Sequence, residues 1–161
     1  MSFANSDIRP LRDADEAREC AQLMVSMDPW RRVGATAESS FQSLSDPAKE
    51  AYVVRADGGV AGLVVLDMRG VLRGYIQTVC VAPAWQGQGL GSLLVGWAER
   101  RIGRESPNVF LCVSSFNPGA RRLYERLGYG VVGRLSNYIV AGHDEILLRK
   151  TSGPWREFGA P

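Results

Sequence analysis

Residues 75–91 read Tyr75-Ile76-Gln77-Thr78-Val79-Cys80-Val81-Ala82-Pro83-Ala84-Trp85-Gln86-Gly87-Gln88-Gly89-Leu90-Gly91. The first seven are nearly all apolar or β-branched, which is typical of a strand buried on both faces in the middle of a sheet. The three glycines that follow let the backbone turn tightly, and they leave no Cβ between main-chain N–H groups and a ligand. A helix is predicted from about Ser92 to Gly103, so this stretch predicts a strand, a glycine-rich turn and a helix in direct succession.

The turn is suited to binding an anion. The first N–H groups of a helix lack partners within the helix, and the helix dipole is positive at that end. We therefore expect a phosphate or pyrophosphate at this turn. The glycine spacing is G-x-G-x-G, whereas the dinucleotide fingerprint is G-x-G-x-x-G, and the Gly-Lys-[Ser/Thr] of a P-loop is missing. Both of these nucleotide sites are excluded.

The segments on either side predict further strands and helices. Strands are expected at 8–11, 51–54, 60–66, 109–113, 130–140 and 144–148, and helices at 13–27, 36–44 and 117–128. The last two strands are joined by a turn at 141–143. These segments predict one α+β domain over residues 1–150, followed by a C-terminal tail at 151–161.

Composition limits the classes of protein to which the chain can belong. With 161 residues, 45% of them hydrophobic, it can bury a sizeable core without disulfides or a structural metal. No apolar run approaches the ~20 residues of a membrane span, and the first residues lack a secretory signal, so we expect a cytoplasmic protein without membrane partners. Residues 82–161 hold 10 basic and 6 acidic side chains, a balance of +4 that suits a small anionic ligand. No block of Lys and Arg with interleaved aromatics indicates nucleic acid.

Cysteine and histidine usage adds two exclusions. Cys20, Cys80 and Cys112 are widely spaced and form no disulfide framework, so they are expected to be reduced thiols. His143 is the single histidine, which argues against a metal site.

Two segments carry a resemblance to a known family. Residues 79–91 closely resemble the acyl-CoA motif Q/R-x-x-G-x-G/A of the GCN5-related N-acetyltransferase (GNAT) superfamily, with Gln86, Gly89 and Gly91 at its fixed positions. Residues 117–129, Asn117-Pro118-Gly119-Ala120-Arg121-Arg122-Leu123-Tyr124-Glu125-Arg126-Leu127-Gly128-Tyr129, resemble its second motif, N-x-x-A-x-x-L-Y-x-x-x-G-[FY]. The motifs are most similar to those of ribosomal-protein N-terminal (alanine) acetyltransferases. The resemblance implies a mixed α/β fold: a central twisted, mostly antiparallel sheet of about seven strands with a splayed parallel pair, flanked by about four helices.

The resemblance also implies acetyl-CoA as cosubstrate, no metal, and direct transfer to an amine in a ternary complex. The N–H of Val79 would polarise the thioester carbonyl, and Val81 would hold the pantetheine arm as an added strand. Tyr124 would protonate the departing thiolate, because a phenol with a pKa near ~10 is a reasonable match to a thiol near ~8.5. The implied cofactor-binding residues are Val79, Cys80, Val81, Gln86, Gly87, Gln88, Gly89, Leu90, Gly91, Ser92, Asn117, Ala120 and Tyr124.

Structural roles for the same residues remain open. Asn117 can serve only as the N-cap of the helix that Pro118 begins, and it can also combine the two roles. Tyr124 lies on the apolar stripe of its helix and can be a core residue.

The general base departs from the family pattern. The family's glutamate, five residues before the motif asparagine, corresponds here to Cys112. Glu145 or Asp144 could act instead through ordered water, although either could equally be a solvated charge of the hairpin. An acceptor with a low pKa would also need less help: an α-amine near ~7.8 lies about 2.6 units below lysine, which is roughly 3.5 kcal/mol. Cys112 as a covalent nucleophile is disfavoured, because it would need a base beside it.

The acceptor site is expected at two segments. Residues 137–145 resemble the hairpin between the sixth and seventh strands of the N-terminal acetyltransferases, which makes Tyr138 a substrate-binding candidate. Trp30 is the candidate for the opposite wall. Three functions stay open: acetylation of a protein or peptide α-amine, acetylation of a small-molecule amine (polyamine, amino acid or aminoglycoside), and non-catalytic acyl-CoA sensing. A homodimer is also left open.

Overall fold

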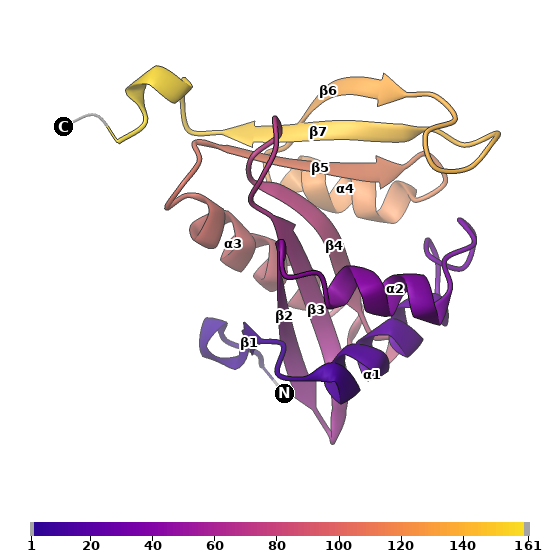
Figure 1. Cartoon of the computed structure of the whole chain (residues 1–161). Helices are drawn as coiled ribbons and strands as arrows, with labels where there is room; N and C mark the ends of the chain where they lie inside the picture. The colour runs from indigo at the N-terminus through magenta and orange to yellow at the C-terminus, as the bar shows by residue number, and fades with distance from the viewer. Residues whose placement is uncertain (1, 160–161) are drawn as a thin grey trace.

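The computed structural model describes residues 2–159, in which a seven-stranded mixed sheet is flanked by four α-helices (Figure 1). The helices are α1 (Ala14–Val25), α2 (Ala37–Leu44), α3 (Leu90–Ile102) and α4 (Pro118–Arg126). The strands are β1 (Arg9–Pro10), β2 (Lys49–Ala56), β3 (Gly59–Asp67), β4 (Tyr75–Val81), β5 (Asn108–Ser114), β6 (Gly130–Leu135) and β7 (Glu145–Thr151). The sheet order is β1-β2-β3-β4-β5-β7-β6, and only the β4–β5 pair is parallel. The expected fold class is confirmed.

Local sequence signals set where the helices begin. Asp13 caps α1 by accepting a hydrogen bond from the N–H of Glu16, and Thr36 and Ser39 form a reciprocal capping box at α2. Asn117 caps α4, with Pro118 as its first helical residue. These short-range contacts explain why the predicted helix starts agree with the structure to within two residues.

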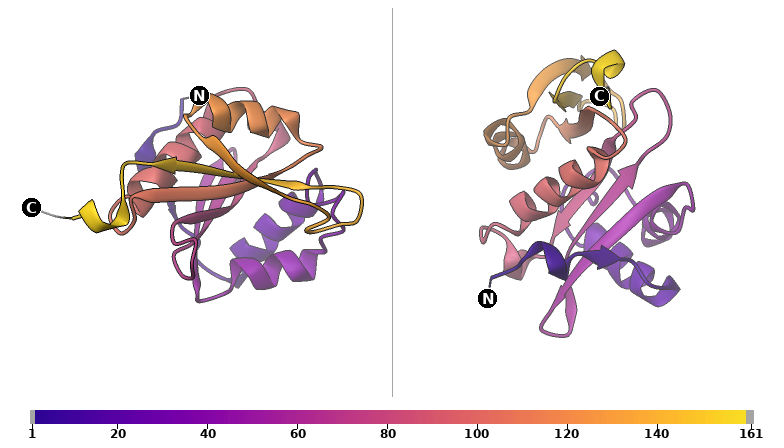
Figure 2. Two further views of the ribbon diagram at one scale, coloured as in Figure 1. Left: turned by 90° about the horizontal axis from the view of Figure 1, so that it is seen from above. Right: turned by 90° about the vertical axis from the view of Figure 1, so that its left-hand side faces the viewer.

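The core consists of two layers, one on each face of the sheet. Helices α1 and α2 cover one face and α3 and α4 the other, as the view from above shows (Figure 2). Helix α3 buries a stripe against β3 and β4, made of Leu90, Leu94, Val95, Ala98 and Ile102. Helix α1 buries Ala17, Cys20, Ala21 and Met24 in the second cluster. Among residues 2–159, no helix is long and apolar enough to cross a membrane.

The parallel pair is joined at one end only. Its register runs from Tyr75↔Phe110 to Ile76↔Leu111 and stops there, after which β4 and β5 diverge. Within β4, Gln77 is an extra residue: Ile76 pairs with Leu66 and Thr78 with Val65, the next residue of β3. Such a bulge reverses which face each later side chain meets.

The strand lies in the middle of the sheet as predicted and buries Ile76 in one core cluster and Cys80 in the other, but it is not buried along its whole length. Gln77 is exposed, and Val79 and Val81 are only partly buried, because the edge of β4 that faces β5 has lost its neighbour. The following helix begins at Leu90, two residues earlier than predicted, with Gly89 as its N-cap.

The predicted strand 130–140 is also too long. Strand β6 ends at Leu135, and residues 136–144 form a loop in which Asn137 has a φ of 52°. The Asn137 side-chain oxygen accepts a hydrogen bond from the backbone N–H of Gly142 (2.7 Å), and the backbone N–H of Asn137 donates to the Asp144 carboxylate (3.2 Å). These contacts close the loop, so Tyr138 lies in a loop and not in a strand.

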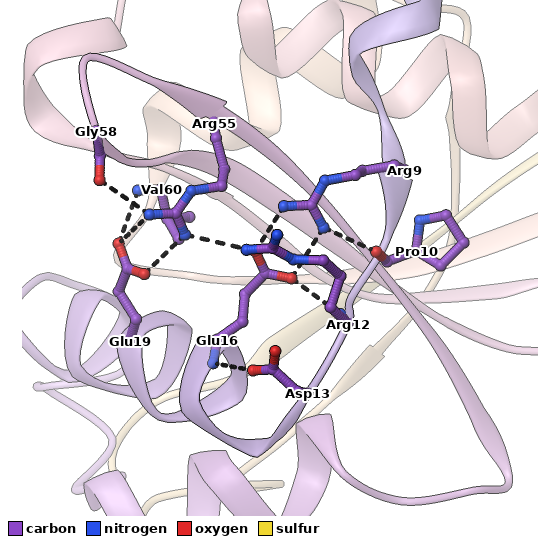
Figure 3. Close-up of polar contacts among 9 residues, drawn as sticks. All are labelled: Arg9, Pro10, Arg12, Asp13, Glu16, Glu19, Arg55, Gly58 and Val60. Carbon is purple, nitrogen blue, oxygen red and sulfur yellow. Dashed lines mark hydrogen bonds and ion pairs between the residues drawn. The ribbon is translucent and has the colours of Figure 1, made fainter.

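A buried carboxylate fixes α1 against the sheet edge (Figure 3). Glu16 is 3% exposed and accepts hydrogen bonds from two guanidinium nitrogens of Arg9 (2.6 and 2.9 Å) and from the N–H of Arg12 (2.9 Å). Arg55 on β2 bridges Glu16 and Glu19. The hydrogen bond from Arg9 lowers the pKa of Glu16 to about 2. This cluster holds the helix whose C-terminal end leads into one wall of the site described next.

Candidate active site

A cleft of about 590 Å³ opens where β4 diverges from β5. Strand β4, the glycine turn and α4 form its walls, and residues 27–30 close one side. The sequence-predicted residues that line it are Trp30, Val79, Cys80, Val81, Gln86, Gly87, Gly89, Gly91, Ser92, Asn117, Ala120 and Tyr124. Two of the predicted cofactor-binding residues do not line it: the Gln88 side chain donates to the carbonyl of Ala84 (2.8 Å), and Leu90 is buried in the core.

The glycine turn presents a row of free backbone donors. Gly87 and Gly89 have φ values of 72° and 86°, which lie in a region that residues other than glycine rarely adopt. Gln86 donates to the carbonyl of Val81 (3.0 Å) and so ties the turn to the end of β4. Within residues 2–159, the N–H groups from Gly87 to Ser92 have no hydrogen-bond partner, and the first helical bond runs from Leu93 to Gly89. The turn can therefore bind a diphosphate through its main chain.

A second, smaller cavity of about 180 Å³ adjoins the cleft. The residues common to the two are Pro29, Trp30, Val79, Asn117, Ala120 and Tyr124. The smaller cavity adds polar groups from three strands, among them Gln77, Cys112 and Glu145. A molecule held in the cleft and one held in this cavity would meet beside Tyr124.

Tyr124 is a core residue and also a wall of both cavities. It is 8% exposed, and its ring lies edge-on to that of Tyr129 at 6.0 Å. Burial raises the pKa of Tyr124 to about 12, because the phenolate would lose its hydration. Tyr124 is therefore protonated at neutral pH and can act as a donor.

Asn117 combines a cap with a place at the site. Its side-chain oxygen accepts from the N–H of Ala120 (3.2 Å), which is the N-cap contact, and the residue also lines both cavities. The amide nitrogen of the same side chain is free of that contact.

Glu145 is buried, whereas Asp144 is not part of the cavity wall. Glu145 is 5% exposed, lines the small cavity and accepts a hydrogen bond from the Ser114 hydroxyl (2.6 Å). Burial raises the pKa of Glu145, and the bond from Ser114 opposes that rise. Asp144 is paired with Arg134, which lowers its pKa. Of the two acidic candidates, only Glu145 lies where it can meet a substrate.

Cys112, Tyr138 and Trp30 lie around the same cavity. Cys112 is half-buried, and burial raises the pKa of its thiol, so it is a poor nucleophile at neutral pH. The only histidine, His143, stacks edge-on against Phe116 at 4.9 Å and does not line the cavity. Tyr138 is 65% exposed at the rim.

Sequence reasoning missed several wall residues. Tyr75, Gln77 and Ser114 line the small cavity, and Arg126 lines the cleft. Arg126 follows Leu123 by three residues on α4, so helical spacing alone could have placed it on the side of α4 that faces the cleft. Among residues 2–159, no group of three His, Cys, Asp or Glu side chains could hold a metal ion.

Comparison with known proteins assigns the family. Residues 14–129 match the model of the Acetyltransferase (GNAT) family, and the chain belongs to this family. It is 32% identical over 152 residues to N-alpha-acetyltransferase RimI of Mycobacterium tuberculosis (strain ATCC 25618 / H37Rv), a match that covers 86% of this chain and 88% of that protein. The protein is an acetyl-CoA-dependent N-acetyltransferase.

Solved structures agree with the fold. The ribosomal-protein-S18-alanine N-acetyltransferase from Escherichia coli superimposes with a TM-score of 0.73 at 18% identity, covering 91% of this chain and 94% of that one. Arabidopsis thaliana NAA60, in complex with a bisubstrate analogue, gives 0.71 at 20% identity over 89% and 96%. At such identities the likeness concerns the fold alone.

Proposed function

We propose that this enzyme transfers the acetyl group of acetyl-CoA to the α-amine of a protein or peptide, by direct attack in a ternary complex. The observation that carries the proposal is the pair of adjoining cavities, which share Tyr124, with the buried Glu145 carboxylate in the smaller one. The 32% identical relative, named as an N-alpha-acetyltransferase, supports the class of acceptor.

Acetyl-CoA fits the larger cleft. Its diphosphate would accept hydrogen bonds from the free N–H groups between Gly87 and Ser92, at the positive end of α3. Its pantetheine arm would lie along the edge of β4 that β5 leaves unpaired, near Val79 and Val81. The thioester would then lie beside Tyr124, where the two cavities join.

The chemistry follows from the two titratable groups. The amine nitrogen attacks the thioester carbon, the C–N bond forms, and the C–S bond breaks as the tetrahedral intermediate collapses. Glu145 accepts the proton that the amine loses, and Tyr124 donates a hydrogen bond or its proton to the departing thiolate. Burial raises the pKa of Glu145 towards that of the amine, which makes it a better base than an exposed carboxylate.

The size of the small cavity and the proton affinity of the acceptor both favour an α-amine. A cavity of about 180 Å³ is smaller than the roughly 300–1,000 Å³ of sites for drug-sized ligands, so it suits one terminal residue whose chain continues past the rim. The exposed side chains of Tyr138 and Ile139 lie at that rim. The free energy needed to deprotonate an α-amine at a given pH is also roughly 3.5 kcal/mol lower than that for lysine.

The test is acetyl-CoA-dependent release of CoA thiol with matched acceptors. Two peptides share one sequence that contains an internal lysine, and the first has a free N-terminus whereas the second has a blocked one. The third arm is a panel of polyamines, amino acids and aminoglycosides. Turnover with the free N-terminus alone is expected. A higher kcat/KM for a small amine would show that the enzyme acetylates small molecules. Tight CoA binding without turnover on any acceptor would indicate a non-catalytic acyl-CoA sensor.

A further inference from the structure

The register of β5 and β7 brings a serine and a glutamate together at the end of the sheet that faces the small cavity. The two strands pair antiparallel, with Cys112 opposite Leu147 and Ser114 opposite Glu145. Side chains two residues apart on a strand share a face, so Ser114 and Glu145 lie on the face that Cys112 occupies. The strand pair thus places the carboxylate of Glu145 on the same face of the sheet as Cys112, opposite the residue two positions further along β5.

The contact between the two side chains is short and enclosed. The Ser114 hydroxyl donates to Oε1 of Glu145 at 2.6 Å, in the range of O–H···O⁻ bonds, and the residues are 7% and 5% exposed. Within residues 2–159 no Arg or Lys pairs with Glu145, and Ser114 is its only donor. A carboxylate accepts at two oxygens, so Oε2 is left for a ligand in the cavity.

The backbone on which Glu145 stands is also fixed. Just beyond the strands, the N–H of Ser115 donates to the carbonyl of Asp144 (2.8 Å), and the N–H of Asp144 donates to the Ser115 hydroxyl (3.2 Å). Neither bond involves the Glu145 carboxylate. The peptide before Glu145 is therefore anchored separately, which leaves Ser114 as the group that sets the orientation of the carboxylate itself.

From this geometry we infer that Ser114 is a positioning residue: its hydroxyl holds one oxygen of Glu145 and directs the other into the acceptor cavity, where the acceptor ammonium would bind. The inference rests on the proposed function of Glu145 as the proton acceptor. Ser114 acts by keeping the carboxylate ionised and aimed at the amine, and it does not itself exchange a proton with the substrate.

The groups that share the cavity with Glu145 do not replace this bond. The other titratable side chains that line the cavity are Tyr75 on β4, Cys112 on β5, Tyr124 on α4 and Tyr138 in the loop before β7, and none of these side chains can carry a positive charge. The guanidinium of Arg134 on β6, the strand that pairs with β7, is bound to Asp144. Because no Arg or Lys among residues 2–159 pairs with Glu145, removing the Ser114 hydroxyl leaves the effect of burial unopposed, and the pKa of Glu145 is expected to rise.

The experiment uses an isosteric pair, Ser114→Thr and Ser114→Val, in the full chain. Both side chains are β-branched and suit a strand, and only threonine keeps a hydroxyl. We expect the acidic limb of the kcat profile to stay in place in Ser114→Thr and to move up by about one to two pH units in Ser114→Val, which is the shift that the loss of a hydrogen bond to a charged group produces. The pH profile is repeated with a second acceptor whose amine has a different pKa. A limb that moves with the acceptor reports the titration of the amine and not that of Glu145.

The control is Ser115→Ala, which removes a hydroxyl bonded to the backbone of Asp144 but not to Glu145. Its acidic limb is expected to stay where it is. An equal shift in Ser115→Ala, or a uniform loss of rate without a shift in Ser114→Val, would overturn the positioning role. Glu145→Gln distinguishes a failure of the proposed function from a failure of the positioning role. If this variant keeps the wild-type kcat and the acidic limb of the pH profile, Glu145 is not the base, and the role of Ser114 falls with it.

Discussion

Removing only the Tyr124 hydroxyl tests the proton donor of the reaction. Tyr124→Phe keeps the ring that packs against Tyr129 and lies in the core, so folding should be unaffected. A positioned general acid contributes about 10²–10⁴-fold to a rate. The pKa of Tyr124 is raised to about 12, and a thiol lies near ~8.5, so full proton transfer is uphill by about 3.5 units, or roughly 5 kcal/mol.

Because of this difference in pKa, we expect the loss of rate to lie at the low end of the range for a general acid. Tyr124 would stabilise the thiolate mainly as a hydrogen-bond donor, and we expect kcat to fall about 100-fold in Tyr124→Phe. CoA affinity should change little, because most of the proposed cofactor contacts lie on the glycine turn and β4. The assay combines thiol release under saturating substrates with calorimetric titration of CoA.

Tyr129→Phe is the matched control. Tyr129 is 4% exposed and lines neither cavity, and its hydroxyl is buried without a hydrogen-bond partner among residues 2–159. Its loss should leave kcat unchanged. If Tyr124→Phe retained most of the wild-type kcat, or if Tyr129→Phe lost as much, the assignment of Tyr124 would be refuted.

Three further predictions concern the cofactor and the sheet edge. Arg126→Gln should lower the affinity for CoA several-fold and the affinity for dephospho-CoA less, because its guanidinium is expected to contact the 3′-phosphate. Arg122→Gln, at a position that lines neither cavity, should change neither affinity, and calorimetric titration of both ligands tests this. Gly89→Ala should weaken CoA about tenfold, because a φ of 86° costs an alanine about 1–2 kcal/mol and displaces the donor N–H groups; unchanged affinity would contradict this. Glu16→Gln should remove up to about 3 kcal/mol of unfolding free energy at neutral pH, since a pKa lowered from 4.5 to about 2 stabilises the fold above pH 4.5 and this contribution is lost as the pH falls towards 2. Urea unfolding at several pH values should therefore give wild-type and variant curves that converge in acid, and parallel curves would disprove the role of Glu16.

Local contacts explain what could be predicted from the sequence. The caps at Asp13, Thr36 and Asn117 act within three residues, and the glycine turn between 87 and 91 is recognised from its own spacing. These signals place the helices, the anion-binding turn and the second motif. The fold class was predictable before any pairing of strands was known because residues 79–91 and 117–129 resemble two motifs of the GNAT family.

Long-range pairing explains what was missed. The contact of Ser114 with Glu145 joins residues 31 apart and depends on the β5–β7 register, which no local pattern specifies. The extra residue at Gln77 is equally invisible in a run of strand-forming side chains. The segment around Tyr138 has β-forming composition, yet the left-handed Asn137 ends the strand before it.

The most direct test is a crystal structure with a bisubstrate conjugate, in which CoA is joined through an acetyl bridge to the α-amine of a short peptide. The diphosphate is predicted to accept hydrogen bonds from the N–H groups between Gly87 and Ser92, with the peptide nitrogen in the small cavity facing Glu145. A diphosphate bound elsewhere, or a peptide that leaves the Glu145 cavity empty, would contradict the proposed arrangement of the reaction.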